Sequence, residues 1–246
     1  MISAPVIHRV ASCSSTNELA LRLAGEGAPE GTVVVAAEQT AGRGTKGRAW
    51  YSARDKGLYV SVLLRPRPAE ISLLPLVAGL AARDAVEKVH GLRIQLSWPN
   101  DLIWEKRKLG GILCQSAFLG NRPDFTILGI GINLNYEEGD FPQDIRPLAT
   151  SVRIALKKNG DPEALLAKLL ESLANWYDVF CRGEKDRIVR SFEAHSAIQK
   201  GDRIQGLMNE QLFSGVYQGL DSDGGLVLED ETGRRALRSA EITKML

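Results

Sequence analysis

The sequence predicts an α+β fold, followed by a small all-β module at the carboxyl end. As far as about residue 195, apolar runs rich in β-branched residues are interspersed with stretches whose apolar residues recur at helical spacing. From about Ile198, short strand-like runs alternate with turns for about 50 residues. A module of this size is too small to hold a deep core, so we expect it to pack against the first domain.

Helix-period stripes and end signals predict four helices in the first domain. Ser15 with Glu18 three residues later is a capping-box pattern, which predicts a helix start. Asp161 followed by Pro162 is a second start, because aspartate caps well and proline suits the first helical position. The four helices are expected to follow Ser15 and to cover residues 72–89, about 161–180 and 185–194.

Compact runs of valine, isoleucine and leucine predict the strands. In the first domain they cover residues 32–38, 57–64, 93–98, 109–115 and 125–132, and in the module 202–207, 212–220, 225–229 and 234–238. Asp221–Gly225 is a turn signal between two strands of the module. Gln39–Lys56 carries three glycines, several charges and Trp50, which predicts a long loop of the kind that is functional or mobile.

Composition and charge argue against several classes of protein. The 31 basic and 30 acidic residues give a net charge of +1, which does not fit a general polyanion binder. The three cysteines, Cys13, Cys114 and Cys181, lack paired zinc-type spacing, and their odd number fits a reduced compartment. The sequence has neither a leader-like segment nor an apolar run of about 20 residues, so we expect a cytoplasmic protein without a membrane span.

The segment Gly42–Trp50, with the sequence GRGTKGRAW, contains the pattern G-x-G-x-x-G. A dinucleotide-binding fingerprint needs a helix that opens at its third glycine, but Trp50, Tyr51 and a strand follow here. A P-loop needs Lys-Ser or Lys-Thr where Arg48-Ala49 stands. Two interpretations stay open for this segment alone: a basic loop that folds over an anion, or an ordinary solvated loop.

Three further segments place polar groups beside predicted strands. Ser97–Leu102 (SWPNDL) projects an asparagine and an aspartate at a strand end, where ligands often bind, although this is also ordinary turn chemistry. Lys108–Leu113 (KLGGIL) could aim an ammonium at a carboxylate or phosphate, and the alternative is a surface lysine. Gly129–Leu134 (GIGINL) leaves one strand face bare, either for a flat ring or for a close crossing of elements.

In this order, the motifs together resemble those of the bacterial biotin protein ligases. GRGTKGRAW resembles their GRGRxGRxW, SWPNDL their KWPNDL, KLGGIL their KxxGGIL and GIGINL their GxGxN. Ser15-Thr16-Asn17 is similar to their serine-threonine-asparagine run, and residues 219–229 (GLDSDGGLVLE) resemble part of their C-terminal module. The chain resembles the monofunctional type, which lacks the N-terminal helix-turn-helix domain, so we expect no DNA binding.

The resemblance implies a fold and a reaction. The fold is α+β, with a mixed β-sheet flanked by helices (the biotin/lipoate ligase-like catalytic domain) over residues 1–195 and a Src-homology-3-like β-barrel over 196–246. The reaction is ATP-dependent activation of biotin to biotinyl-5′-AMP, with release of pyrophosphate, and transfer of biotin to a lysine of a biotin carboxyl carrier protein of acetyl-CoA carboxylase. Mg²⁺ would accompany ATP without permanent protein ligands, and a homodimer is compatible with the family.

The resemblance also assigns roles to residues. The reacting groups would be served by Lys108, Arg43, Arg48 and Asp101. The positions that contact biotin would be Ser15, Thr16, Asn17, Gln39, Gly42, Arg43, Gly44, Thr45, Lys108 and Gly111. ATP and the adenylate would contact Arg43, Arg48, Trp50, Asn100, Lys108, Gly131 and Asn133. The chemistry agrees, because the biotin carboxylate and the α-phosphate are two anions that need cations to hold them in line.

Two residues depart from the family motifs. Thr45 stands where the family loop has its second arginine, and Ser97 stands where the family has a lysine before Trp-Pro-Asn-Asp. Each change removes a positive charge near the expected site. Two rival functions stay open: a lipoate or octanoate ligase of the same fold, and a degenerate, non-catalytic binder of biotin or adenylate. Pyrophosphate exchange with biotin or lipoate separates the first rival, and single-turnover formation of biotinyl-AMP separates the second.

Overall fold

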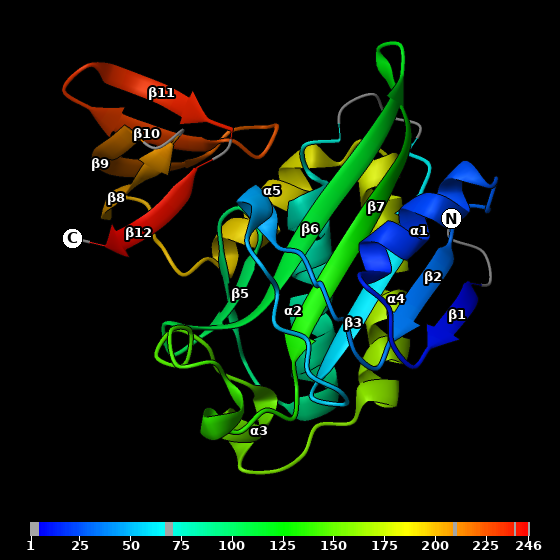
Figure 1. Cartoon of the computed structure of the whole chain (residues 1–246). Coiled ribbons are helices and arrows are strands. Elements are labelled where there is room, and N and C mark those ends of the chain that lie inside the picture. The colour runs from blue at the N-terminus through cyan, green and yellow to red at the C-terminus, as the bar shows by residue number, and fades with distance from the viewer. Residues whose placement is uncertain (1–4, 67–70, 209–210, 239, 246) are drawn as a thin grey trace.

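The computed structural model describes residues 5–66, 71–208, 211–238 and 240–245, which build two β-sheets with helices (Figure 1). The larger sheet has seven strands in the order β1-β2-β3-β7-β6-β5-β4. These strands are β1 Val6–Val10, β2 Thr32–Ala36, β3 Gly57–Leu64, β4 Gln95–Ser97, β5 Asp101–Trp104, β6 Arg107–Leu119 and β7 Arg122–Asn133. β1 and β2 pair in parallel and the other neighbours pair antiparallel, so the predicted mixed sheet is confirmed.

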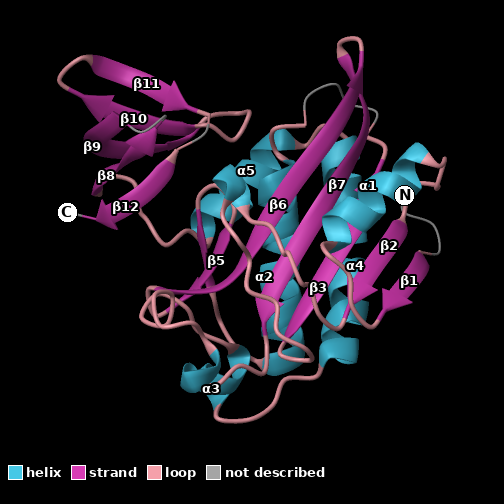
Figure 2. Ribbon diagram, in the orientation of Figure 1, coloured by secondary structure: helices cyan, strands magenta, loops and turns pink. Residues whose placement is uncertain are grey.

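Helices cover both faces of the larger sheet (Figure 2). They are α1 Thr16–Gly25, α2 Leu74–His90, α3 Val152–Leu156, α4 Pro162–Cys181 and α5 Lys185–Ala194, with 3-10 turns η1 Thr45–Gly47 and η2 Glu138–Asp140. On one face, α2 and α4 bury the main core, in which Leu80 and Leu169 join Val60 of β3. On the other face, α1 packs Ala20 against a smaller cluster that includes Ile127 of β7.

The alternation of side chains along a strand decides which face each residue reaches. In β3, Leu58 and Val60 belong to the main core. The intervening Tyr59 and Ser61 point to the α1 face, where the Ser61 hydroxyl hydrogen-bonds two residues of α1. Polar side chains therefore gather on the part of this face that borders the start of α1.

The C-terminal residues form a five-stranded antiparallel sheet in the order β11-β10-β9-β8-β12, the expected Src-homology-3-like module. Its strands are β8 Arg203–Met208, β9 Gln211–Leu220, β10 Leu226–Asp230, β11 Gly233–Leu237 and β12 Glu241–Met245. The predicted turn Asp221–Gly225 contacts the first domain. The Trp98 indole N–H donates to the carbonyl of Gly224 at 2.8 Å, and Lys185 pairs with Asp223 at 2.6 Å.

Every predicted helix and strand has a counterpart among the described residues, whereas three strands and one α-helix were not predicted. The predicted strand 57–64 and the predicted helix 185–194 coincide with β3 and α5. The elements without a prediction are β1, β5, β12 and the five-residue α3. β5 begins at Asp101, within the segment that the sequence indicated as a turn.

The predicted capping box at α1 is wrong. Ser15 is the N-cap residue, but its side chain makes no cap hydrogen bond. Glu18 instead accepts a hydrogen bond from the Ser14 hydroxyl at 2.6 Å and forms an ion pair with Arg43. A guanidinium is a stronger partner for a carboxylate than a neutral backbone N–H. By contrast, the predicted cap at Asp161 forms, with its carboxylate accepting two backbone N–H bonds at 3.0 Å each.

None of the described helices is both long enough and apolar enough to cross a membrane.

Candidate active site

The floor of the candidate site is the α1-facing side of β7. Ile130 and Ile132 point into the main core, so Gly129 and Gly131 face the site. A Cβ on Gly131 would lie 2.6 Å from the Trp50 indole nitrogen, and one on Gly129 would lie 2.9 Å from Cγ of Asn17. Side chains at these positions would collide, so the glycines permit the close approach of Trp50 and Asn17. The predicted bare strand face thus exists, and in this structure Trp50 covers part of it.

A buried hydrogen-bond network forms one wall of the site. The Ser61 hydroxyl lies 2.6 Å from Oδ1 of Asn17 and 2.8 Å from the Thr16 hydroxyl. Asn17 donates through Nδ2 to Oε1 of Gln115 at 2.8 Å. Gln39 accepts from the backbone N–H of Thr16 at 2.8 Å. Sequence reasoning missed Ser61 and Gln115, although a serine within the apolar run GLYVSVLL was a usable signal.

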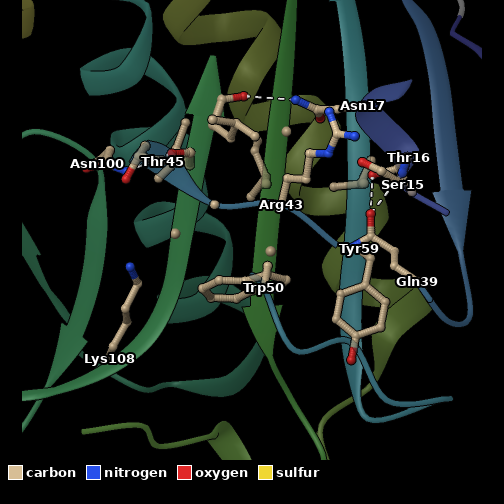
Figure 3. Close-up of a pocket in the computed structure, with 18 residues that line it drawn as sticks. Ser15, Thr16, Asn17, Gln39, Arg43, Thr45, Trp50, Tyr59, Asn100 and Lys108 are labelled. Atoms are coloured by element: carbon tan, nitrogen blue, oxygen red, sulfur yellow. Dashed lines mark hydrogen bonds between the residues drawn. The ribbon is translucent and has the colours of Figure 1, made fainter. Parts of the chain in front are cut away.

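The loop Gly42–Trp50 is folded into a tight hairpin. The Trp50 N–H donates to the Gly42 carbonyl at 2.8 Å, and the Gly44 N–H donates to the Arg48 carbonyl at 2.7 Å. The turn passes through η1, where Lys46 has a φ of 57°. Arg43 lines the site and is anchored by its ion pair with Glu18 of α1. The hairpin therefore holds Trp50 and Arg43 over the sheet, as Figure 3 shows.

Lys108 lies at the centre of the site. Its ammonium pairs with Oδ1 of Asp101 at 2.7 Å and lies 5.5 Å from the centroid of the Trp50 ring. That carboxylate oxygen is buried, and the Lys108 ammonium is its partner. The Lys108 backbone pairs with the chain at Leu148 and Thr150, with N···O distances of 2.7 and 2.9 Å. These two hydrogen bonds fix the backbone of Lys108.

Three cavities meet beside Lys108 and Thr45, which border all of them. The first has a volume of about 40 Å³ and lies over the polar wall at Thr16, Asn17, Gln39 and Tyr59. The second has a volume of about 210 Å³ and is walled by Trp50, Tyr51, Phe141, Ile145 and Leu148. The third has a volume of about 480 Å³ and lies between Trp98, Asn100, Asp101 and the C-terminal residues Ala240 and Ile242.

The structure brings the residues predicted from the sequence together. All of them except Gly42 border at least one of the three cavities. Gly42 instead allows the loop to fold closely, because a Cβ on Gly42 would lie 2.9 Å from the Ser52 hydroxyl. The amides of Asn100 and Asn133 donate to backbone carbonyls, those of Ile112 at 2.8 Å and Thr150 at 3.0 Å. Both asparagines therefore hold the frame of the site as well as border it.

Comparison with known proteins identifies the family. The model of the biotin/lipoate A/B protein ligase family matches residues 10–133, and that of the biotin protein ligase C-terminal domain matches residues 201–245. The chain belongs to the biotin/lipoate A/B protein ligase family. It is 33% identical over 234 residues to the bifunctional ligase/repressor BirA of Bacillus subtilis, a match that covers 93% of this chain and 71% of BirA.

Two further relatives match along almost their whole length. The biotin–[acetyl-CoA-carboxylase] ligase of Paracoccus denitrificans is 30% identical over 245 residues, which cover 95% of this chain and 98% of that protein. The solved structure of the biotin protein ligase from Aquifex aeolicus in complex with biotin and ATP superposes with a TM-score of 0.84 at 30% identity, and the match covers 97% of each chain. Both domains of this ligase-family chain therefore have counterparts in these two relatives.

Proposed function

We propose that the protein activates biotin with ATP to biotinyl-5′-AMP and transfers the biotinyl group to a lysine of the biotin carboxyl carrier protein of acetyl-CoA carboxylase. One observation carries the proposal: three cavities share Lys108 as a lining residue. The reaction requires such a meeting point for an acid, a nucleotide and an incoming amine. The relatives named as biotin–[acetyl-CoA-carboxylase] ligases favour biotin over lipoate as the acid.

In the first step, a carboxylate oxygen of biotin attacks the α-phosphorus of ATP, and the bond to pyrophosphate breaks. Lys108, Arg43 and Arg48 would neutralise the charge of the two anions. The Lys108 ammonium would exchange its pairing with Asp101 for phosphate oxygens when the nucleotide enters. The residues proposed to hold ATP and the adenylate are Arg43, Arg48, Trp50, Asn100, Lys108, Gly131 and Asn133.

Biotin is proposed to occupy the first cavity. Amide and hydroxyl groups along the wall at Thr16, Asn17 and Gln39 suit a polar ring system with both donors and acceptors. The residues proposed to contact biotin are Ser15, Thr16, Asn17, Gln39, Gly42, Arg43, Gly44, Thr45, Lys108 and Gly111. The second cavity, with the aromatic walls of Trp50 and Phe141, suits a nucleotide base.

In the second step, the amine of the carrier lysine attacks the acyl carbon of the anhydride, AMP leaves, and the amine gives up a proton. Asp101 borders the third cavity, and its carboxylate would lose its ammonium partner when Lys108 turns to the phosphate oxygens. We propose that this carboxylate accepts the proton. The third cavity is large enough to admit a lysine side chain from a docked partner.

Magnesium is proposed to enter with ATP. The ion would be bound mainly by the phosphates of ATP. We also propose a cytoplasmic location and a domain boundary at residues 195/196, between the end of α5 at Ala194 and the start of β8 at Arg203.

The proposal is tested by incubating the protein with biotin, Mg-ATP and a carrier domain, followed by the intact mass of the carrier. The expected result is a gain of one biotinyl group, with biotin-dependent and lipoate-independent exchange of pyrophosphate into ATP. Exchange with lipoate instead of biotin would support the lipoate ligase. Binding of biotin without any adenylate in a single turnover would support the non-catalytic binder.

The loop Gly42–Trp50 is expected to open and close during the reaction. The first cavity, at about 40 Å³, holds only a few water molecules, so the loop must move before a bicyclic acid can enter. Since Arg43, Lys46 and Arg48 lie in the loop, trypsin reports its accessibility. We expect cleavage there to slow by at least about tenfold with biotin plus ATP, while cleavage at exposed Arg234 changes little. Equal loop cleavage with and without substrates would contradict this.

Thr45→Arg is expected to slow the escape of biotinyl-AMP by about tenfold, because one charge-assisted hydrogen bond contributes roughly 1.5–3 kcal/mol. Thr45 borders all three cavities but is uncharged and short. Labelling of bystander lysines should fall, while carrier labelling stays similar or improves. The measurement is the off-rate of biotinyl-AMP, with Thr232→Arg on the exposed turn of the module as a charge-matched control. Equal off-rates for wild type and Thr45→Arg would show that Thr45 is a neutral variation.

A further inference from the structure

Two buried tyrosines outside the family motifs lie beside the site. Tyr59 of β3 and Tyr136, which follows β7, are 1% and 0% exposed, and their hydroxyl oxygens are 2.6 Å apart. Tyr59 lines the first cavity, whereas Tyr136 borders none of the three. No role in binding substrate explains the Tyr136 hydroxyl, so its contacts within the protein indicate what it does.

The hydroxyl pair holds residues 51–53, which directly follow the Gly42–Trp50 loop and are called the loop root below. The backbone N–H of Ala53 donates to Tyr136 Oη at 2.8 Å, and Tyr59 Oη donates to the Ala53 carbonyl at 2.9 Å. Tyr136 Oη also lies 3.2 Å from the carbonyl of Tyr51. Residues 51–53 come directly after Trp50, so a shift of this root moves the indole that covers Gly131.

The hydroxyl pair has fewer protons than acceptors. Burial raises the pKa of Tyr136 to about 12, and burial together with the neighbouring Tyr136 raises the pKa of Tyr59 further, so both hydroxyls keep their protons at neutral pH. These two protons face three acceptors: the carbonyls of residues 51 and 53 and the other hydroxyl. A proton must lie between oxygens that are 2.6 Å apart, so only one carbonyl is held at a time. The loop root therefore has two alternative hydrogen-bond arrangements.

The ring of Tyr136 connects this root to the second cavity. It stacks on Phe141, with centroids 4.7 Å apart and planes at 15°. Phe141 and Tyr51 both line the second cavity, and the ring of Tyr51 lies 5.9 Å from that of Tyr136. A nucleotide base that packs against Phe141 would restrain the Tyr136 ring, and through it the hydroxyl pair and the loop root.

We infer that Tyr136 is a positioning residue that couples occupation of the nucleotide cavity to the position of the Gly42–Trp50 loop, through its hydroxyl pair with Tyr59. The inference rests on the proposed function, because it takes the second cavity as the nucleotide site and the first as the biotin site. The coupling would be seen as a tightening of biotin binding by nucleotide, and reciprocally.

The test measures biotin affinity by calorimetry with and without a non-hydrolysable ATP analogue. Tyr136→Phe keeps the ring that stacks on Phe141 and removes only the hydroxyl. We expect wild type to bind biotin at least about fivefold more tightly with the analogue, and this factor to fall to below twofold in Tyr136→Phe. The protection of the loop from trypsin by the two ligands together should fall in parallel.

Tyr177→Phe is the matched control. Tyr177 of α4 is also buried, at 2% exposure, its hydroxyl donates to Glu30 at 2.7 Å, and it borders none of the three cavities. It should lower the midpoint of thermal unfolding as Tyr136→Phe does, yet leave the coupling factor unchanged. A second variant, Phe141→Leu, removes the ring that joins the second cavity to Tyr136 and keeps the hydroxyl pair. It should also reduce the factor by which the analogue tightens biotin binding.

The outcomes separate the inference from the proposed function. An unchanged coupling factor in both Tyr136→Phe and Phe141→Leu would overturn the inference, as would wild type that binds biotin and the analogue independently. Wild type that forms no biotinyl-AMP would overturn the proposed function instead. If Tyr136→Phe does not fold, the test rests on Phe141→Leu alone. A coupling factor equal to that of wild type in Phe141→Leu would then contradict the inference.

Discussion

Lys108→Ala is expected to lower biotin-dependent pyrophosphate exchange by about a hundredfold or more, equivalent to about 3 kcal/mol of transition-state stabilisation. Lys108 lines all three cavities, and its side chain is 36% exposed. Its removal leaves the carboxylate of Asp101 without its cation while two further anions must enter the same space. The measurement is the exchange rate at saturating biotin and ATP.

Lys168→Ala is the matched control for this prediction. Lys168 lies on α4 and pairs with Glu171 at 2.6 Å, a distance close to that of the Lys108–Asp101 pair. A lysine in a surface ion pair contributes little, so its removal should leave exchange within about twofold of wild type. Near-normal exchange in Lys108→Ala would show that the ammonium takes no part in adenylation.

Local signals predicted the elements that do not depend on distant partners. Strand β3 follows from its β-branched run, and the start of α4 follows from the Asp161 cap. The capping box at Ser15 failed because Arg43, far along the chain, takes Glu18 as its partner. β5 was missed because it is four residues long and begins inside a turn-like segment. Its pairing with β6 stabilises it, and no pattern within its own residues indicates that pairing.

The motifs predicted which residues gather at the site but not what holds them there. Alternation along β7 puts Gly129 and Gly131 on one face, which the sequence shows directly. The contact of Asn17 with Gln115 joins residues 98 positions apart, and a lone glutamine in a strand gives no signal for it. Tyr136 was also missed, because its importance lies in backbone groups of a loop more than 80 residues away.

Gly129→Ala is expected to weaken biotin binding by about a hundredfold. The new Cβ would lie 2.9 Å from Cγ of Asn17 and closer still to its Oδ1. Asn17 is 4% exposed and is held by Ser61 at 2.6 Å and Gln115 at 2.8 Å, so it cannot move without breaking these bonds. Each buried polar group that loses its partner costs roughly 1–3 kcal/mol. Displacement of Asn17 would therefore both cost free energy and deform the wall of the first cavity. The measurement is the dissociation constant of biotin.

Gly25→Ala is the control, because a Cβ on Gly25, at the end of α1, has no heavy atom within 4 Å. It should bind biotin as wild type does. In Gly129→Ala, the affinity for an ATP analogue in the absence of biotin should change far less than that for biotin, since Gly129 does not border the second cavity. Equal losses for both ligands would indicate a general collapse of β7, and unchanged biotin binding would show that Asn17 is not part of the biotin wall.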